Sequence, residues 1–243
     1  MNDRDWIDEL SNYLQQNFLR LCEVLGQPRS INELRINPPL AIVEAKYFLL
    51  GLESGLFRLD EKECVQSELL PRPSSGNFKQ ELCQIFVLSP PPPRIVRENI
   101  CQLATASSLV FQRGWLPSQI KIGTDDSASY GVDMIVESAA GETLICVEIK
   151  RSVHELQKFT SDFRQCCKRG EHAKADCAFQ QNHGLFEFCG RHEPTYLWIV
   201  APGHDVCLKL SYAGGMIEIE ELDTLPPRSH IEFGLSQSST DAQ

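Results

Sequence analysis

The stretch YGVDMIVESAAGETLICVEIKRS, from Tyr130 to Ser152, contains two apolar runs joined by a short polar turn. The runs have the length and the β-branched content of buried strands, so the stretch predicts an antiparallel hairpin. Each run also carries side chains that are costly to bury without partners, namely Asp133 in the first run and Glu148 and Lys150 in the second. These three charges need either partners or a function.

The register of this hairpin decides whether the two carboxylates meet. A four-residue loop pairs Ser138 with Thr143, and counting back from that pair places Asp133 opposite Glu148. Directly opposed side chains have Cβ atoms about 5 Å apart. Side chains alternate along a strand, so one face of the second strand is expected to carry Leu144, Cys146, Glu148 and Lys150.

Two buried carboxylates at that distance must share either a proton or a cation. Oxygen ligands favour Mg²⁺ or Mn²⁺. Lys150, on the same face, could hold or deprotonate a water or stabilise the charge of a pentavalent phosphate. A carboxylate pair, a metal and a lysine predict a centre that hydrolyses phosphodiesters. The alternative is a surface hairpin with solvated charges, which the apolar neighbours of Asp133 and Glu148 disfavour.

Hydrophobic periodicity and turn residues predict the elements around the hairpin. Helices are expected at residues 3–25, 40–53, 94–112 and 153–169, with a further helix through Gln181. Strands are expected as a short pair within 55–65, at 118–122, 131–138, 143–152 and 196–202, and as a final hairpin at 207–222. The fold class is α/β, with a mixed sheet flanked by helices.

The proline run from Ser89 to Pro93 suggests a boundary between two domains. We expect a small, mostly helical N-terminal domain at 1–88, a second domain at 94–235 and a disordered tail at 236–243. The N-terminal part faintly resembles a winged-helix module, although plain helical subdomains give the same pattern. It is expected to contact DNA, a partner protein or a second copy of the chain.

The hairpin motif resembles that of a known superfamily. Gly131-Val132-Asp133, followed after fourteen residues by Glu148-Ile149-Lys150, looks like the motif of the PD-(D/E)XK phosphodiesterases, which include restriction endonucleases, Holliday-junction resolvases and recombination nucleases. Val132 replaces the proline of the motif name. The resemblance covers about Arg94 to Leu225 and implies a restriction-endonuclease-like core with the element order αβββαβ.

The resemblance also implies roles for individual residues. Asp133 and Glu148 would bind the divalent metal, the main-chain carbonyl of Ile149 would add a ligand, and Lys150 would position the attacking water. Glu98 would be the further glutamate that members often place on the first core helix, unless it is simply a solvated helix-start residue.

Contacts to DNA are expected to be local, because the chain carries a formal charge of −10. Gln157 on the helix after the hairpin would face the site, while Lys158 and Arg164 would reach phosphates; an ordinary polar helix face explains them equally well. They belong to a basic rim that consists of Lys150, Arg151, Lys158, Arg164, Lys168, Arg169 and Lys174.

Cysteines and histidines gather between Cys166 and His192, where a structural zinc or an iron–sulfur cluster is one interpretation. The favoured interpretation is helix-packing cysteines and surface histidines, because no CxxC pair occurs and Cys189-Gly-Arg-His192 is the only close ligand spacing. Whether this stretch binds metal stays open.

These patterns predict a cytoplasmic hydrolase, a Mg²⁺- or Mn²⁺-dependent DNA endonuclease acting in antiviral defence or in DNA repair. No 18-residue apolar run and no basic, apolar leader occur, so no membrane association is expected. The main alternative is a catalytically silent protein of the same fold that binds DNA or protein. A zinc-stabilised regulatory protein is the third possibility.

Overall fold

The computed structural model describes residues 4–61, 63–70, 84–88, 94–124, 127, 129–170, 172–177, 180 and 182–232. All structural statements below concern these residues. The predicted disordered tail at 236–243 and the proline run from Ser89 to Pro93 lie outside them.

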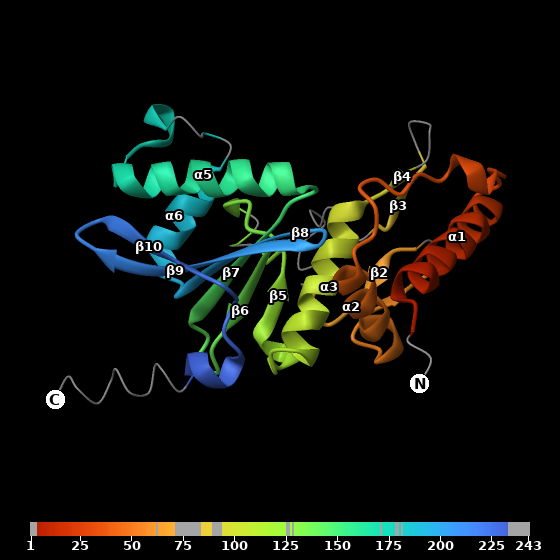
Figure 1. Ribbon diagram of the computed structural model, residues 1–243, viewed down its shortest axis with the longest axis horizontal. Coiled ribbons are helices and arrows are strands. Elements are labelled where there is room, and N and C mark those ends of the chain that lie inside the picture. Colours follow the sequence, from red (N-terminus) through yellow and green to blue (C-terminus); the bar gives the residue numbers. More distant parts are fainter. Residues whose placement is uncertain are drawn as a thin grey trace.

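A six-stranded mixed sheet forms the centre of the fold (Figure 1). Its strands lie in the spatial order β10-β9-β8-β7-β6-β5, and every neighbouring pair is antiparallel except β7 with β8. The strands are β5 (Ile120–Ile122), β6 (Met134–Glu137), β7 (Thr143–Ile149), β8 (Tyr196–Ala201), β9 (His204–Ala213) and β10 (Met216–Leu222). The predicted mixed α/β architecture is therefore confirmed.

Helices cover both faces of the sheet. Helix α3 (Arg97–Phe111) packs on the face that carries Val136, Ile145 and Val147. Helices α5 (Val153–Arg169) and α6 (His183–His192) pack on the face that carries Cys146. Successive side chains of β6 and β7 therefore point alternately into two separate hydrophobic cores, one on each face of the sheet.

The N-terminal helix α2 (Ile42–Glu53) packs against α3, and α1 (Trp6–Val24) packs against α2, at the right of Figure 1. One continuous cluster of buried side chains runs from α1 and α2 through α3 to the sheet. Helix α3 is consequently buried along most of its length. The remaining elements are the strand pairs β1 (Arg58–Leu59) with β2 (Val65–Gln66) and β3 (Phe86–Val87) with β4 (Arg94–Ile95), and 3₁₀ turns at Ile31–Glu33, Pro117–Gln119 and Lys174–Asp176.

The first residue of α3 is anchored in the N-terminal region. Arg97 forms a buried ion pair with Glu44 of α2, and its guanidinium also donates to the main-chain carbonyls of Pro38 and Pro39. A buried ion pair is tolerated when additional hydrogen bonds satisfy the remaining donors, as these carbonyls do for part of the guanidinium.

Helix α5 agrees with its predicted bounds. Its N-cap is Ser152, whose hydroxyl accepts from the amide of Glu155, and its C-cap is Gly170 with φ 74°. Buried side chains recur at the helical spacing that the sequence showed, at Leu156, Phe159, Phe163, Cys166 and Cys167. This helix was predictable because capping residues mark both of its ends and its apolar residues lie on one side.

The further helix predicted after Arg169 and through Gln181 is wrong for the described residues. Only one 3₁₀ turn, Lys174–Asp176, is present in the described part of that segment, and α6 starts later, at His183. Gly170 reverses the chain after α5. The apolar residues of α6, which include Leu185, Phe186 and Phe188, gave a signal that the sequence interpretation did not use.

The predicted hairpin register holds at the far end and fails near the turn. Met134 pairs with Val147 as the counting requires, but Thr143 pairs with Glu137 instead of Ser138 because a β-bulge intervenes. Leu144 consequently joins Ile145 in the core under α3, whereas Cys146 lies in the core under α5. The expectation that Leu144 shares a face with Cys146 is therefore wrong.

Candidate active site

Asp133 lies directly before β6, at the end of the hairpin away from its turn. Its Oδ2 accepts a hydrogen bond of 2.7 Å from the main-chain amide of Ile149 in β7. Since Met134 pairs with Val147, continuing that register by one residue brings Asp133 opposite Glu148. The bulge lies on the other side of these pairs, so it does not disturb this end of the hairpin.

Glu148 and Lys150 occupy the same face of the second strand, as the two-residue period requires. Glu148 is 3% exposed, and its Oε2 accepts a hydrogen bond of 2.7 Å from Lys150 Nζ. The ammonium of Lys150 also lies over the ring of Phe159, 4.0 Å from the ring centroid. Helix α5 thus supplies an aromatic wall for the lysine, a contact that the sequence interpretation missed.

Gln102 on α3 is a second residue that the sequence interpretation missed. Its side-chain amide donates a 2.9 Å hydrogen bond to the main-chain carbonyl of Asp133, and its side chain is buried. Gln102 lies four residues after Glu98, so both stand on the same side of the helix. The signal available in the sequence was a long polar side chain in the middle of a helix whose neighbouring residues are mostly small or apolar.

Burial raises the pKa of both carboxyl groups. Burial, and then the charge of Asp133, raise the pKa of Glu148 to about 8. Burial also raises the pKa of Asp133, against the opposing effects of Lys150 and the Ile149 amide. Burial by itself lowers the pKa of Lys150, but Glu148 and Asp133 outweigh it and the pKa is raised. Without a metal, the carboxyl pair therefore retains a proton at neutral pH and Lys150 stays charged.

The residues fit a hard divalent cation. The Oδ2 of Asp133 accepts from an amide and the Oε2 of Glu148 accepts from Lys150, and the two carboxyl groups also share a hydrogen bond with each other. A cation bound between them would replace the proton of that shared hydrogen bond. The repulsion that raises the pKa of Glu148 is the interaction that a shared cation would reverse. The donor set of carboxylate oxygens is the one that Mg²⁺ and Mn²⁺ prefer.

Glu98 lies at the edge of this group. Its Oε1 is 3.6 Å from Nε of Arg151, its side chain is 46% exposed, and its charge contributes to the raised pKa values of Asp133 and Lys150. Among the described residues, however, Glu98 is not close enough to Asp133 and Glu148 to form a three-carboxylate group.

The side chains predicted to contact DNA are mostly engaged with carboxylates. Arg151 pairs with Glu98 and with Glu155, Lys158 pairs with Asp162 at 2.6 Å, and Arg164 pairs with Glu221 of β10. Gln157 is exposed on α5. The basic rim is therefore more nearly neutral than the sequence suggested.

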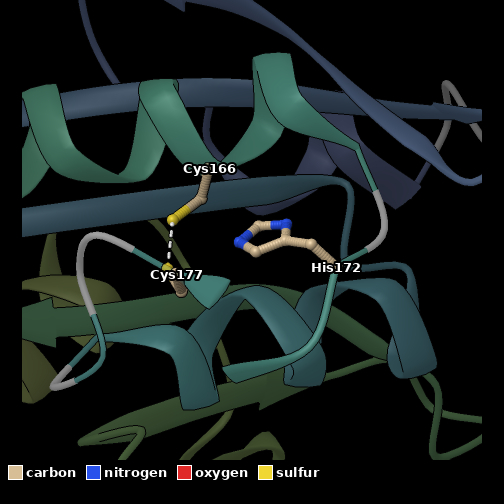
Figure 2. Close-up of side chains that lie close together, drawn as sticks. All are labelled: Cys166, His172 and Cys177. Atoms are coloured by element: carbon tan, nitrogen blue, oxygen red, sulfur yellow. Dashed lines mark hydrogen bonds between the residues drawn. The ribbon is translucent and has the colours of Figure 1, made fainter. Parts of the chain in front are cut away.

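The cysteine- and histidine-rich stretch divides into two parts. Cys166, His172 and Cys177 converge, and the ligand atoms of the three lie within 4.8 Å of one another (Figure 2). Cys189 instead packs near Cys146 in the core, and His192 stacks on Phe188 with ring centroids 4.2 Å apart. The buried position of Cys189 agrees with the interpretation of helix-packing cysteines, and the residues that do converge are not the pair with the closest spacing in the sequence. The nine described cysteines are buried, and none forms a disulfide.

Histidine burial corrects a further expectation. His183 is fully buried, so the interpretation of these histidines as surface residues is wrong for it. Its ring meets the ring of His172 edge-on, with centroids 5.0 Å apart.

Comparison of the chain with protein-family models, with curated proteins and with solved structures finds no match. The interpretation of the site therefore depends on its own residues and their geometry. In the described part of the chain, no helix has both the length and the apolar character that crossing a membrane requires.

Proposed function

We propose that this chain is a metal-dependent endonuclease that hydrolyses DNA phosphodiester bonds. The observation that carries the proposal is the convergence of Asp133, Glu148 and Lys150 at one end of a core hairpin, with both carboxyl pKa values raised. The element order α3, β5, β6, β7, α5, α6, β8 agrees with the αβββαβ order of the PD-(D/E)XK superfamily except for the additional helix α6 before β8. This agreement supports a restriction-endonuclease-like core.

In this proposal Asp133 and Glu148 hold Mg²⁺ or Mn²⁺, and the main-chain carbonyl of Ile149 adds a ligand. A divalent cation bound there stabilises the negative charge that builds up on the phosphate oxygens during hydrolysis. Gln102 acts as a positioning residue, because its hydrogen bond fixes the main chain of Asp133.

Lys150 orients the attacking water by donating a hydrogen bond. Its pKa is raised, so the side chain remains an ammonium at neutral pH and serves as a donor and a positive charge instead of a base. Phe159 and Glu148 together limit where the ammonium can lie. Orientation of this kind is a substantial part of the rate enhancement in phosphoryl transfer.

The wider predictions follow from this activity. DNA binds at the exposed rim formed by Glu98, Arg151 and the start of α5, where Gln157 and Lys158 also lie. The N-terminal domain at 1–88 contacts DNA, a partner protein or a second copy, and a cytoplasmic role in defence or repair stays a prediction.

A second candidate function is a catalytically silent protein of the same fold that binds DNA or protein. The ion pairs that neutralise Arg151, Lys158 and Arg164 favour it, as does the formal charge of −10, because both weaken the attraction for phosphates.

Nicking of supercoiled plasmid distinguishes the two functions. The wild-type chain should nick the plasmid in Mg²⁺ or Mn²⁺ and stop when the metal is chelated. Asp133→Asn and Lys150→Ala should lower the rate by about 10²-fold or more, because they remove a metal ligand and the water-orienting donor. The matched control is Glu142→Gln, which removes an exposed carboxylate from the turn of the same hairpin.

Two results would decide against catalysis. One is a rate of nicking by the wild type that equals the rate of Asp133→Asn. The other is plasmid binding by the wild type without any nicking, which would support the silent alternative. Calorimetric titration with Mn²⁺ adds an independent readout, because Asp133→Asn should weaken binding and Glu142→Gln should not.

A further inference from the structure

A second group of potential metal ligands lies at the far end of α5 from Lys150. Cys166 stands in the last turns of α5, Cys177 follows the 3₁₀ turn Lys174–Asp176, and His172 lies between them in sequence. The two sulfur atoms are 3.3 Å apart. In Figure 2 the imidazole of His172 points toward these sulfur atoms.

The chain reaches this arrangement through local contacts. Gly170, with φ 74°, ends α5 and reverses the chain direction. The guanidinium of Arg169 then donates to the main-chain carbonyl of Asp176, which ties the end of the helix to the 3₁₀ turn. These two features bring Cys177 beneath Cys166.

The hydrogen bonding of His172 fixes its tautomer. Nδ1 lies 2.6 Å from the main-chain carbonyl oxygen of Gly170, so Nδ1 carries the proton and donates it. Nε2 is then the nitrogen with the lone pair. It is buried and has no nitrogen or oxygen partner among the described residues, and the side-chain contact of His172 is with the thiol of Cys177. Histidines that ligate metals commonly donate their other N–H to a carbonyl in this way.

His183 adds to the number of buried nitrogens without hydrogen bonds at this place. Its Nδ1 has no hydrogen-bond partner among the described residues, whereas its Nε2 lies 3.4 Å from Oε1 of Glu187. Buried polar atoms of native proteins are nearly always satisfied by protein, water or an ion. The convergence of two sulfur atoms and Nε2 of His172, next to the ring of His183, therefore calls for a ligand.

We propose that Cys166, His172 and Cys177 bind one Zn²⁺ through two thiolates and Nε2. Two sulfurs and an imidazole nitrogen are the donors that zinc prefers, and they are poor ligands for Mg²⁺. Sulfur atoms bound to one tetrahedral zinc at about 2.3 Å lie roughly 3.8 Å apart, so the pair needs to open by only about 0.5 Å. The fourth position is left to solvent, and His183 holds the ring of His172.

The zinc site is separate from the proposed nuclease site. Cys166 lies fourteen residues after Ser152, which corresponds to about 21 Å along a helix. The role of the zinc is structural: it joins the end of α5 to the connection that leads to α6. Since α5 packs on β8 and β10, the site stabilises the layer that covers this face of the sheet.

Metal analysis of the purified full-length chain tests the proposal. After dialysis with a reductant, the wild type should retain about one zinc per chain, and Cys166→Ser, Cys177→Ser and His172→Ala should lose most of it. Cys22→Ser is the matched cysteine control, because Cys22 is equally buried but lies in α1. His154→Ala is the histidine control, on the exposed side of α5.

Cobalt provides a readout that does not require a variant. Replacement of zinc by Co²⁺ in the wild type should give the visible absorption of a tetrahedral cobalt site and a thiolate charge-transfer band in the near ultraviolet. A wild-type chain that binds neither metal would overturn the proposal. So would mass spectrometry that finds a disulfide between Cys166 and Cys177 in freshly purified, metal-free protein, or equal zinc loss in Cys22→Ser.

Discussion

The two ends of α5 carry two groups of side chains with opposite chemistry. Near its start, the carboxyl groups of Asp133 and Glu148 offer hard oxygen ligands held by regular strand pairing, with the ammonium of Lys150 beside them. At its end, Cys166, His172 and Cys177 offer soft ligands held by an irregular connection. The comparison teaches that the first group can be located from the two-residue repeat of side chains along a strand. The second group depends on individual turns that bring distant residues together.

Selective removal of zinc should have the largest effect on stability. A chelator of soft metals is expected to lower the melting temperature of the wild type by about 5–10 °C, because the site closes a loop at the end of α5. Plasmid nicking in excess Mg²⁺ at 25 °C should change little, since the two sites use different donors. Calorimetric scans of the wild type and His172→Ala, each with and without chelator, measure this.

In that experiment His172→Ala is the control. Its melting temperature should be lower than that of the wild type even without chelator, and the chelator should not lower it further. If the chelator abolished nicking but left the melting temperature unchanged, the assignment of separate roles to the two ends of α5 would be wrong.

The metal-free hairpin should lose stability as the pH rises. The pKa of Glu148 is about 8 in the folded chain, against 4.5 for an ordinary glutamate. Between about pH 5 and pH 8 the folded chain therefore binds more protons than the unfolded chain, so the free energy of unfolding falls across this window, by up to a few kcal/mol. Urea unfolding in EDTA at pH 5.5 and pH 8.5 measures the change.

Glu148→Gln removes this titration and should flatten the difference between the two pH values. Saturating Mg²⁺ should do the same in the wild type, because the cation favours the ionised carboxylates. An unchanged pH dependence in Glu148→Gln would show that this carboxyl group does not carry the effect.

Gln102→Ala should have the smallest of these effects. It removes the hydrogen bond to the main-chain carbonyl of Asp133, at a cost of about 1 kcal/mol in stability. We expect roughly tenfold slower nicking at saturating DNA, with little change in DNA affinity, because the variant loosens Asp133 and not the DNA contacts.

Gln112→Ala, at an exposed position just after the same helix, is the control for this variant. A purely structural role for Gln102 would lower stability and leave the nicking rate of the folded fraction intact. Restoration of nicking by Gln102→Asn at higher Mn²⁺ would sharpen the positioning role.

The parts of the fold that sequence could predict are those with a repeating signal. The bounds of α5 and the meeting of Asp133 with Glu148 followed from helical and strand periods. The β-bulge that moved Leu144 to the other face did not, because one extra residue in a strand leaves no mark on the apolar pattern.

The parts that escaped prediction depend on contacts between distant segments. The bond from Gln102 to Asp133 joins a helix to a strand end thirty-one residues later, and periodicity says nothing of such a pair. The grouping of Cys166 with Cys177 required the reversal at Gly170, and no close ligand spacing in the sequence marks this pair.

The anchoring of Arg97 connects the N-terminal helices to the rim of the proposed catalytic end. Arg97 is clamped by Glu44 and the carbonyls of Pro38 and Pro39, and its neighbour in sequence is Glu98, which faces Arg151. The contacts of Arg97 therefore link the position of Glu98, at the rim of the proposed site, to the placement of α2.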